Sequence, residues 1–250
     1  MYTKSILVAT LAGLAATSPI ESRQFSGIGG TGSSSSEFSQ GGCRDILFAF
    51  ARGSTEIGNM GTVVGPPTSD GLKKAFGSDK VATEGIPYAA SIATNLIPGG
   101  TDSKSKDLLQ STLTSMAEKC PDSIIVSGGY SQGAAVNHRA IEALDAAVQQ
   151  KIAGVVLYGD TQKQQDKDQI PNFPKDKVKI ICQPGDAVCV GTLSVLPAHL
   201  TYGMRVDEGV EFLVQQIKAM QNKARARDVK REAVAAMAET VKKVAKTIAV

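Results

Sequence analysis

The chain has 250 residues, of which 42% are hydrophobic, 20% are charged and 5% are aromatic, and it contains no tryptophan. This composition excludes collagen-like, disordered and small disulfide-scaffold proteins, and the length suits one or two domains with a substantial core. The net charge of +3 is unevenly distributed, because residues 218–250 carry nine Lys or Arg against three acids, which leaves the remainder at −3.

The N-terminal residues have the pattern of a secretory signal peptide. Lys4 precedes an apolar run over 6–16 that is too short to span a bilayer and is closed by small residues. We therefore expect a signal peptide at 1–18 and a secreted, extracellular protein; a buried N-terminal helix is the alternative. Residues 19–42 are rich in Ser and Gly without apolar periodicity, which predicts a flexible leader or propeptide.

The pattern changes at Cys43 to one typical of a folded α/β domain. Short continuous apolar runs predict buried strands at 46–51, 123–127, 155–158 and 178–181. Apolar residues at helical spacing predict helices that begin at Ser103 and that cover 132–150 and 209–221. Because strands and helices alternate, we expect one domain over 43–220, a three-layer α/β/α sandwich around a mainly parallel sheet.

The most informative local motif is Gly129-Tyr130-Ser131-Gln132-Gly133, which fits G-x-S-x-G between a predicted strand and a predicted helix. A serine there occupies a sharp turn with its hydroxyl exposed, and the N–H of Gln132 points to where an oxyanion would form. An ordinary glycine-rich turn is the alternative. Ser54, in the loop after the first strand, is a candidate second oxyanion donor; otherwise that loop is merely polar.

A serine nucleophile needs a base, and the chain has two histidines. His138 lies about 10 Å along the same predicted helix from the serine, at 1.5 Å per residue, so we expect a surface or packing residue. His199 lies downstream, in the order Ser…acid…His. The acid is Asp186, between two cysteines, or Asp160, which follows a strand and is otherwise a solvated turn residue. Spacing favours Asp186.

The cysteines predict disulfides. Four cysteines in an exported chain allow three pairings of two bridges. The short separation favours Cys182–Cys189 and leaves Cys43–Cys120. A metal site is disfavoured, because no C-x-x-C spacing occurs and only two histidines are present.

Four motifs in order make the chain resemble the fungal cutinases, small secreted serine esterases of the α/β-hydrolase type. They are Ala51-Arg52-Gly53-Ser54-Thr55-Glu56-Ile57-Gly58-Asn59, Gly128-Gly129-Tyr130-Ser131-Gln132-Gly133-Ala134-Ala135, Cys182-Gln183-Pro184-Gly185-Asp186-Ala187-Val188-Cys189 and His199-Leu200-Thr201-Tyr202. The resemblance implies a triad of Ser131, Asp186 and His199, which decides between the two acids, and an oxyanion hole at Ser54 and Gln132. It also implies the two disulfides favoured above.

The resemblance further implies a crevice flanked by 88–98, with Asn95 supporting Ser54, and by the residues before the histidine. The candidate substrate contacts are Tyr130, Ile92, Asn95, Val195 and Leu196. An apolar rim of this kind suits insoluble polyesters and short acyl chains; the alternative is that these aliphatic residues only pack. Asp160 and Pro197-Ala198 depart from the commonest family pattern, which bears on substrate preference.

The activity implied by the resemblance is carboxylic ester hydrolysis through an acyl-enzyme. The expected substrate is cutin or another ester at a surface, and the enzyme is expected to act as a monomer without metal, cofactor or nucleic acid. A second hypothesis is an acetylxylan-type carbohydrate esterase. A third is a catalytically retired surface or effector protein.

The family pattern ends near Met220, so residues 221–250 are an addition. Their apolar residues recur at helical spacing with Lys and Arg opposite, which predicts a basic amphipathic helix. One interpretation is that this helix packs on its own domain or extends into solvent. The other is that it binds an anionic surface, such as wall pectin or a membrane.

Overall fold

The computed structural model describes the backbone of residues 30–248 and the side-chain surroundings of residues 30–238. The expected signal peptide at 1–18 and the first part of the expected leader lie outside these residues. Five parallel strands form the central sheet in the order β2-β1-β3-β4-β5. Their bounds are Ile46–Ala51 for β1, Val81–Gly85 for β2, Ile124–Tyr130 for β3, Ile152–Tyr158 for β4 and Val178–Ile181 for β5.

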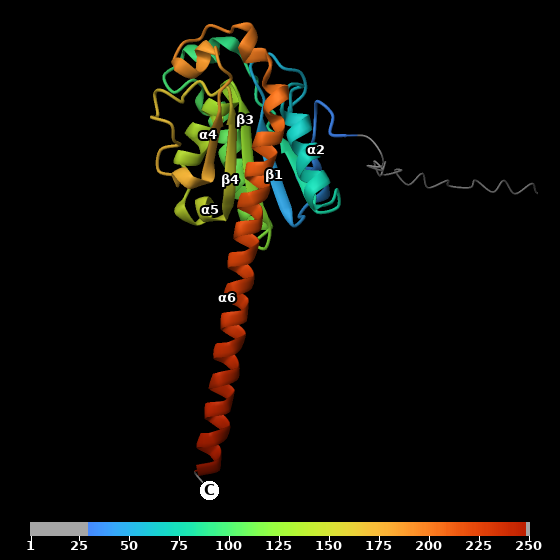
Figure 1. Ribbon diagram of the computed structural model, residues 1–250, viewed down its shortest axis with the longest axis vertical. Coiled ribbons are helices and arrows are strands. Elements are labelled where there is room, and N and C mark those ends of the chain that lie inside the picture. The colour runs from blue at the N-terminus through green and yellow to red at the C-terminus, as the bar shows by residue number, and fades with distance from the viewer. Residues whose placement is uncertain (1–29, 249–250) are drawn as a thin grey trace, which may run out of the picture.

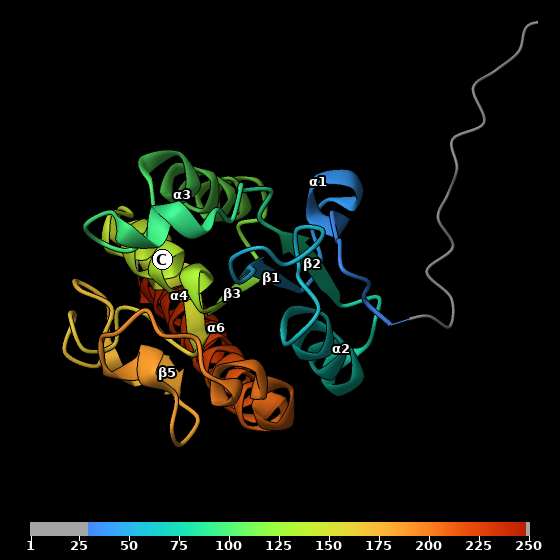
Figure 2. The same cartoon turned by 90° about the horizontal axis from the view of Figure 1, so that it is seen from above.

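Helices cover both faces of this sheet, which confirms the predicted three-layer fold (Figure 2). On one face lie α3 (Ser103–Lys119), α4 (Gln132–Glu142) and α5 (Ala146–Lys151), and on the other lie α2 (Gly65–Phe76) and α6 (Val206–Ile248). Alternate residues of one strand serve the two cores, because Leu47 packs with the first group of helices and Phe48 with the second. Five short 3-10 helices lie in connections: η1 (Ile92–Leu96), η2 (Lys175–Lys177), η3 (Ala187–Val190), η4 (Pro197–Leu200) and η5 (Tyr202–Arg205).

Two predictions of secondary structure were incomplete. Strand β2 was missed because its sequence Val-Ala-Thr-Glu-Gly has no apolar run, although all five residues are buried. The helix predicted over 132–150 is two helices, because the chain turns between Glu142 and Ala146. Asp145 there adopts an extended-type conformation that precedes α5, a position at which aspartate is favoured.

Part of the segment predicted as a flexible leader is packed against the domain. The backbone N–H of Thr31 donates to Asp70, Ser36 forms an antiparallel bridge with Glu84, and α1 (Glu37–Gly41) buries Phe38. This segment covers β2, which would otherwise leave an edge of the sheet open. The prediction of a flexible leader to residue 42 is therefore wrong for the part that the structure describes, and the packed domain begins at least as early as Thr31.

The predicted C-terminal helices are one continuous helix, α6, of 43 residues. Leu213 and Ile217 are fully buried against the sheet, whereas the helix beyond Met220 leaves the domain as a rod (Figure 1), and its side chains are mostly exposed as far as residue 238. Over the described part of the chain, no helix is both long and apolar enough to cross a membrane.

Candidate active site

The strand-to-helix turn between β3 and α4 holds Ser131 in a strained conformation. Its φ of 54° lies in the left-handed region that favours glycine, and its backbone N–H donates to the carbonyl of Tyr158 at 2.9 Å. Glycines two positions away on either side permit the crowding. A Cβ on Gly129 would lie 2.3 Å from the Gly133 carbonyl oxygen, and one on Gly133 would lie 1.9 Å from that of Ala51. The turn therefore projects a half-buried serine hydroxyl at the carboxyl edge of the sheet.

Ser131 meets His199 and Asp186 in one chain of hydrogen bonds. His199 Nε2 lies 2.9 Å from Ser131 Oγ, and Nδ1 lies 2.8 Å from Asp186 Oδ2. Because an ionised carboxylate only accepts, Nδ1 carries the proton and Nε2 is free to accept from the serine. The exposed fraction is 2% for His199 and 4% for Asp186, so both work away from bulk water. The structure thus brings together the three residues predicted to form a triad.

The carboxylate of Asp186 is held from two sides within a loop that the Cys182–Cys189 disulfide closes. Its Oδ1 accepts from the N–H of Val188 at 3.0 Å, and its Oδ2 accepts from the Tyr202 hydroxyl at 2.7 Å. Burial and then the hydrogen bond to Asp186 raise the pKa of the Tyr202 phenol, which therefore stays protonated and donates. The other predicted disulfide, Cys43–Cys120, also forms, far along the chain from this loop.

The side chain of Tyr130 packs against His199 inside the domain. Its side chain is buried, its hydroxyl donates to the His199 carbonyl at 2.6 Å, and its ring stacks on the imidazole at a centroid distance of 5.3 Å. The prediction of a substrate contact at Tyr130 is therefore corrected. The sequence placed this residue beside the nucleophile, but only the fold decides that its ring turns inward.

Ser54 and Gln132, the two residues predicted to form an oxyanion hole, are each held by side-chain contacts with η1 or the residue before it. Asn95 Nδ2 donates to Ser54 Oγ at 2.9 Å, as the resemblance implied, so the serine hydroxyl proton is left to point elsewhere. The buried amide of Gln132 donates to the Ser91 carbonyl at 2.8 Å and to Thr94 Oγ1 at 2.6 Å. That second role, which ties η1 to the nucleophile helix, was missed from sequence.

Glu56 is a further residue that sequence reasoning missed. Its carboxylate accepts from three backbone N–H groups, those of Gly53 at 2.7 Å, Thr62 at 2.8 Å and Val63 at 3.0 Å. These bonds hold the loop that carries Ser54. The motif quoted for this loop contained Glu56, but nothing in the sequence showed that its carboxylate turns back onto its own backbone.

Exposed aliphatic side chains line the two segments beside the triad. Ile92 is 65% exposed and Leu96 77% in η1, and Val195 is 59% exposed and Leu196 45% before η4. In Figure 1 both segments lie at the same end of the molecule, where the strands end. Because these side chains are not buried in a core, packing inside the domain does not explain why they are apolar.

Asp160 and His138 pair with one another and not with the triad. Asp160 Oδ2 lies 2.9 Å from His138 Nε2, and both side chains are fully buried. The alternative acid is thus occupied elsewhere. Of the two positions predicted for His138, surface or packing, the structure has the packing one, and Asp160 is buried and not a solvated turn residue, because each supplies the other with a buried partner.

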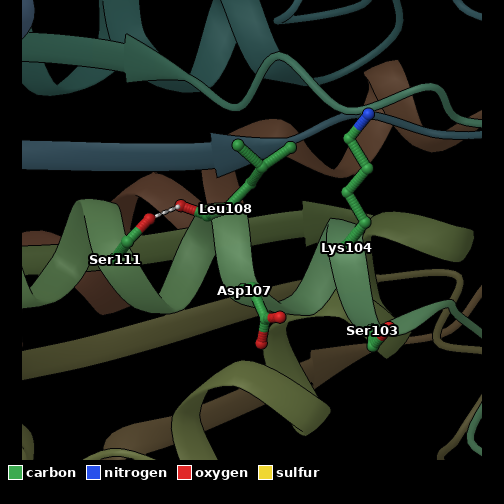
Figure 3. A pocket seen from close by; sticks show the side chains of 5 residues that line it. All are labelled: Ser103, Lys104, Asp107, Leu108 and Ser111. Atoms are coloured by element: carbon green, nitrogen blue, oxygen red, sulfur yellow. Dashed lines mark hydrogen bonds between the residues drawn. The ribbon is translucent and has the colours of Figure 1, made fainter.

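Two surface depressions lie outside this region. One, of about 390 Å³, runs along α3 and is lined by Ser103, Lys104, Asp107, Leu108 and Ser111 (Figure 3). Lys104 and Asp107 point apart in it, and the Ser111 hydroxyl donates to the carbonyl of Leu108. The other, of about 760 Å³, lies between α1 and α3. Neither lining contains a histidine, so neither offers a serine with its base.

Comparison with known proteins gives a consistent family. A family model described as Cutinase matches residues 42–217. A probable cutinase 1 of Aspergillus niger is 46% identical over 226 residues, covering 86% of this chain and 85% of that protein. Cutinase 3 of Emericella nidulans is 45% identical over 217 residues, covering 85% and 97%.

Solved structures agree. A Trichoderma reesei cutinase in complex with a phosphonate inhibitor is 36% identical with a TM-score of 0.64, covering 70% of this chain and 77% of that one. The catalytic core domain of acetyl xylan esterase from Trichoderma reesei is 16% identical with a TM-score of 0.53, covering 70% and 99%, a likeness of fold alone.

Proposed function

Because this chain belongs to the cutinase family and is a carboxylic ester hydrolase, we propose that Ser131, His199 and Asp186 are its catalytic triad. The observation that carries the proposal is the hydrogen-bond chain from Asp186 Oδ2 through His199 to Ser131 Oγ. In the reaction His199 Nε2 takes the hydroxyl proton as Ser131 Oγ attacks the ester carbonyl. Asp186 stabilises the imidazolium that forms.

The oxyanion hole stabilises the negative charge that develops on the carbonyl oxygen. The N–H groups of Ser54 and Gln132 donate to it, and the Ser54 hydroxyl is oriented to donate as well because its lone pair already accepts from Asn95. His199 then protonates the leaving alcohol. Water, activated by the same histidine, releases the acid from the acyl-enzyme and returns Ser131 to its starting state.

The proposed substrates are cutin or similar polyesters and short acyl esters. The support is the exposed aliphatic rim formed by Ile92, Leu96, Val195 and Leu196, which suits an apolar acyl chain better than a carbohydrate. An acetylxylan-type substrate fits this rim less well. A retired scaffold is disfavoured by the intact hydrogen-bond chain.

The proposed function is tested by substituting the proposed nucleophile, Ser131. Ser131→Ala removes Oγ and keeps a small side chain at the strained turn, so we expect hydrolysis of p-nitrophenyl butyrate to fall by a factor of about 10⁴ or more. Near-normal turnover in the folded variant would contradict the triad. A phosphonate probe should label the wild-type protein at Ser131 and fail to label the variant.

The substrate class is tested separately. We expect the wild-type enzyme to release monomers from a model polyester faster than it releases acetate from acetylated xylan. The reverse order would favour the carbohydrate esterase.

We also propose that the protein is secreted and acts as a monomer. Secretion is supported by the signal-peptide pattern at 1–18 and by the two disulfides, since disulfides persist in oxidising compartments.

The C-terminal extension is proposed to bind an anionic lipid surface. Its described residues expose Val229, Val234 and Met237, which a polysaccharide partner would leave in water, while residues 218–250 carry a net charge of +6.

A further inference from the structure

A second histidine lies between carboxylates, two turns along α4 from Ser131. His138 Nδ1 is 2.6 Å from Asp166 Oδ2, and Nε2 is 2.9 Å from Asp160 Oδ2. The side chain of His138 is fully buried, as is that of Asp160, and the side chain of Asp166 is 12% exposed. The proposed reaction uses none of these three residues, yet each represents a polar group removed from water, which is costly unless it is paired.

With Asp160 and Asp166 ionised, the geometry requires a protonated imidazole. Ionised carboxylates only accept hydrogen bonds, so a ring with a carboxylate on each nitrogen must donate from both, which only the imidazolium does. Burial lowers the pKa of His138, but the charges and hydrogen bonds of Asp160 and Asp166 outweigh it and raise the pKa to about 9. The side chain is therefore a cation at neutral pH.

Other charged side chains surround His138, Asp160 and Asp166. On α4 itself, Arg139 makes a second ion pair with Asp166 and also lies 3.2 Å from Glu142. Burial raises the pKa of Glu142 and is the largest effect; Arg139 lowers it, Asp166 raises it, and His138 and then Lys106 of α3 lower it by less. Asp166 thus has two cationic partners, whereas Asp160 has His138 alone as its cation among these groups. Loss of the His138 charge would leave the Asp160 carboxylate buried and uncompensated.

Asp160 ends a run of three residues that contacts the backbone of Ser131 and the side chain of His199. The carbonyl of Tyr158 accepts the N–H of Ser131 at 2.9 Å. A Cβ added to Gly159 would lie 2.8 Å from His199 Cε1, so the backbone at Gly159 abuts the imidazole. The next residue, Asp160, pairs with His138 and accepts a hydrogen bond from the N–H of Gln162 at 2.8 Å. The end of β4 therefore connects the buried ion pair to the nucleophile and to the base.

We propose that His138 is a positioning residue, whose ion pairs with Asp160 and Asp166 hold the end of β4 against α4 and thereby keep Ser131 and His199 at reacting distance. The inference rests on the proposed triad. The seven-residue separation that removes His138 from the role of base is what places it on the same side of α4, behind Ser131, at 100° per residue.

The positive charge of His138 predicts the direction in which kcat changes with pH. The pKa of about 9 in the folded protein is above the ordinary 6.5, so the pairing stabilises fully below about pH 6.5 and loses its effect as pH rises through 9. We therefore expect the wild-type kcat to fall with a midpoint near pH 9, and the chemical shifts of the His138 ring to titrate at the same pH in NMR spectra.

The decisive variants are His138→Gln and the double variant His138→Gln/Asp160→Asn in the full chain. The single variant leaves Asp160 uncompensated, and we expect kcat for p-nitrophenyl butyrate at pH 7 to fall about 10-fold to 100-fold with little change in KM. The double variant removes the orphaned charge, so kcat should partly recover and should no longer fall near pH 9. Loss of packing alone would make the two substitutions additive and would move no titration.

Glu142→Gln is the matched control, because it removes a carboxylate from α4 that pairs with Arg139 and not with His138. We expect it to keep both kcat and the fall near pH 9. If the single variant does not fold, the comparison of the double variant with wild type still decides. The proposal is overturned if His138 titrates near pH 6.5, if the wild-type kcat is constant from pH 8 to 10, or if the double variant is worse than the single one. Failure of the triad would instead appear as activity in Ser131→Ala, with the His138 titration unaffected.

Discussion

At the scale of single residues, the site is organised by groups that do not touch the substrate. Ser131, His199 and Asp186 form the hydrogen-bond chain, but tyrosine hydroxyls fix two of them. Tyr130 donates to the backbone of His199, and Tyr202 donates to the Asp186 carboxylate. A hydrogen bond to a charged group contributes about 1.5–3 kcal/mol and one to a neutral carbonyl about 0.5–1.5 kcal/mol, so the Tyr202 hydroxyl holds its partner more strongly than the Tyr130 hydroxyl does.

Tyr202→Phe removes the hydroxyl between Asp186 Oδ2 and the N–H of Gln183, and it keeps the ring. Asp186 then keeps the N–H of Val188 as its one remaining donor besides His199, and its carboxylate can turn away from His199. We expect kcat for p-nitrophenyl butyrate to fall about 10-fold, equivalent to about 1.4 kcal/mol, with KM unchanged. Steady-state kinetics of the folded variant measure this.

Tyr158→Phe is the matched control. Tyr158 is equally buried, and its hydroxyl contacts Thr68 at 3.1 Å, with no contact to the triad. The variant should lose about 1 kcal/mol of unfolding free energy and keep its kcat. Equal kinetic losses in the two variants would argue that Tyr202 acts only through packing.

At the scale of elements, the proposed reacting groups lie in loops at the ends of the strands. Hydrogen bonds and a disulfide hold these loops in place. Glu56 holds the loop that carries Ser54, Gln132 ties η1 to α4, and a disulfide closes the loop that carries Asp186. The two disulfides differ in what they constrain. Cys182–Cys189 spans seven residues around Asp186, whereas Cys43–Cys120 spans 77 and joins the start of β1 to the end of α3.

Replacing each disulfide by a pair of serines should separate activity from stability. Loop entropy gives a loss of about 2.5 kcal/mol for Cys182→Ser/Cys189→Ser and about 4.5 kcal/mol for Cys43→Ser/Cys120→Ser. We expect the first pair to lose more kcat, because it frees the loop that holds Asp186, and the second to lose more unfolding free energy. Denaturant unfolding and kinetics on both variants test this. Activity losses that follow the stability losses would contradict it.

The elements predicted from sequence were those with strong patterns. Apolar runs located four of the five strands, because a strand covered on both faces has no polar alternation. Strand β2 was not predicted, because Thr83 and Glu84 are polar and are buried by means of partners elsewhere in the chain. Ser35 donates to the Thr83 carbonyl, and the Glu84 carboxylate accepts from the N–H of Phe38. A local pattern does not record such distant partners.

At the scale of the whole molecule, the protein is a domain with a charged rod at one end. Figure 1 shows α6 leaving the domain at the end opposite the loops that carry the candidate triad. The chain order requires this, since α6 begins at Val206, just after His199, and runs back along the sheet. A surface bound by the extension would therefore leave the site facing away from it.

Truncation after Met220 tests the extension. The cut lies beyond Leu213 and Ile217, so the domain should keep its kcat for a soluble ester. We expect the full chain to sediment with anionic lipid vesicles at low salt and the truncated chain to remain in solution, with binding weakened by added salt. Equal retention of both chains would contradict the proposal. Retention on pectin but not on vesicles would identify a wall polymer as the partner instead.

The family, the three-layer fold and the three residues of the hydrogen-bond chain could all be predicted from the sequence. Motif identity and short-range periodicity are local properties, and with two histidines in the chain few bases were available. The packing of the folded chain was needed to show that Tyr130 turns inward, that residues 31–42 cover an edge of the sheet, and that His138 is buried between two carboxylates. Those outcomes depend on which distant groups meet: a buried polar side chain is stable only where another part of the chain supplies its partner, and the partners of His138 lie 22 and 28 residues away.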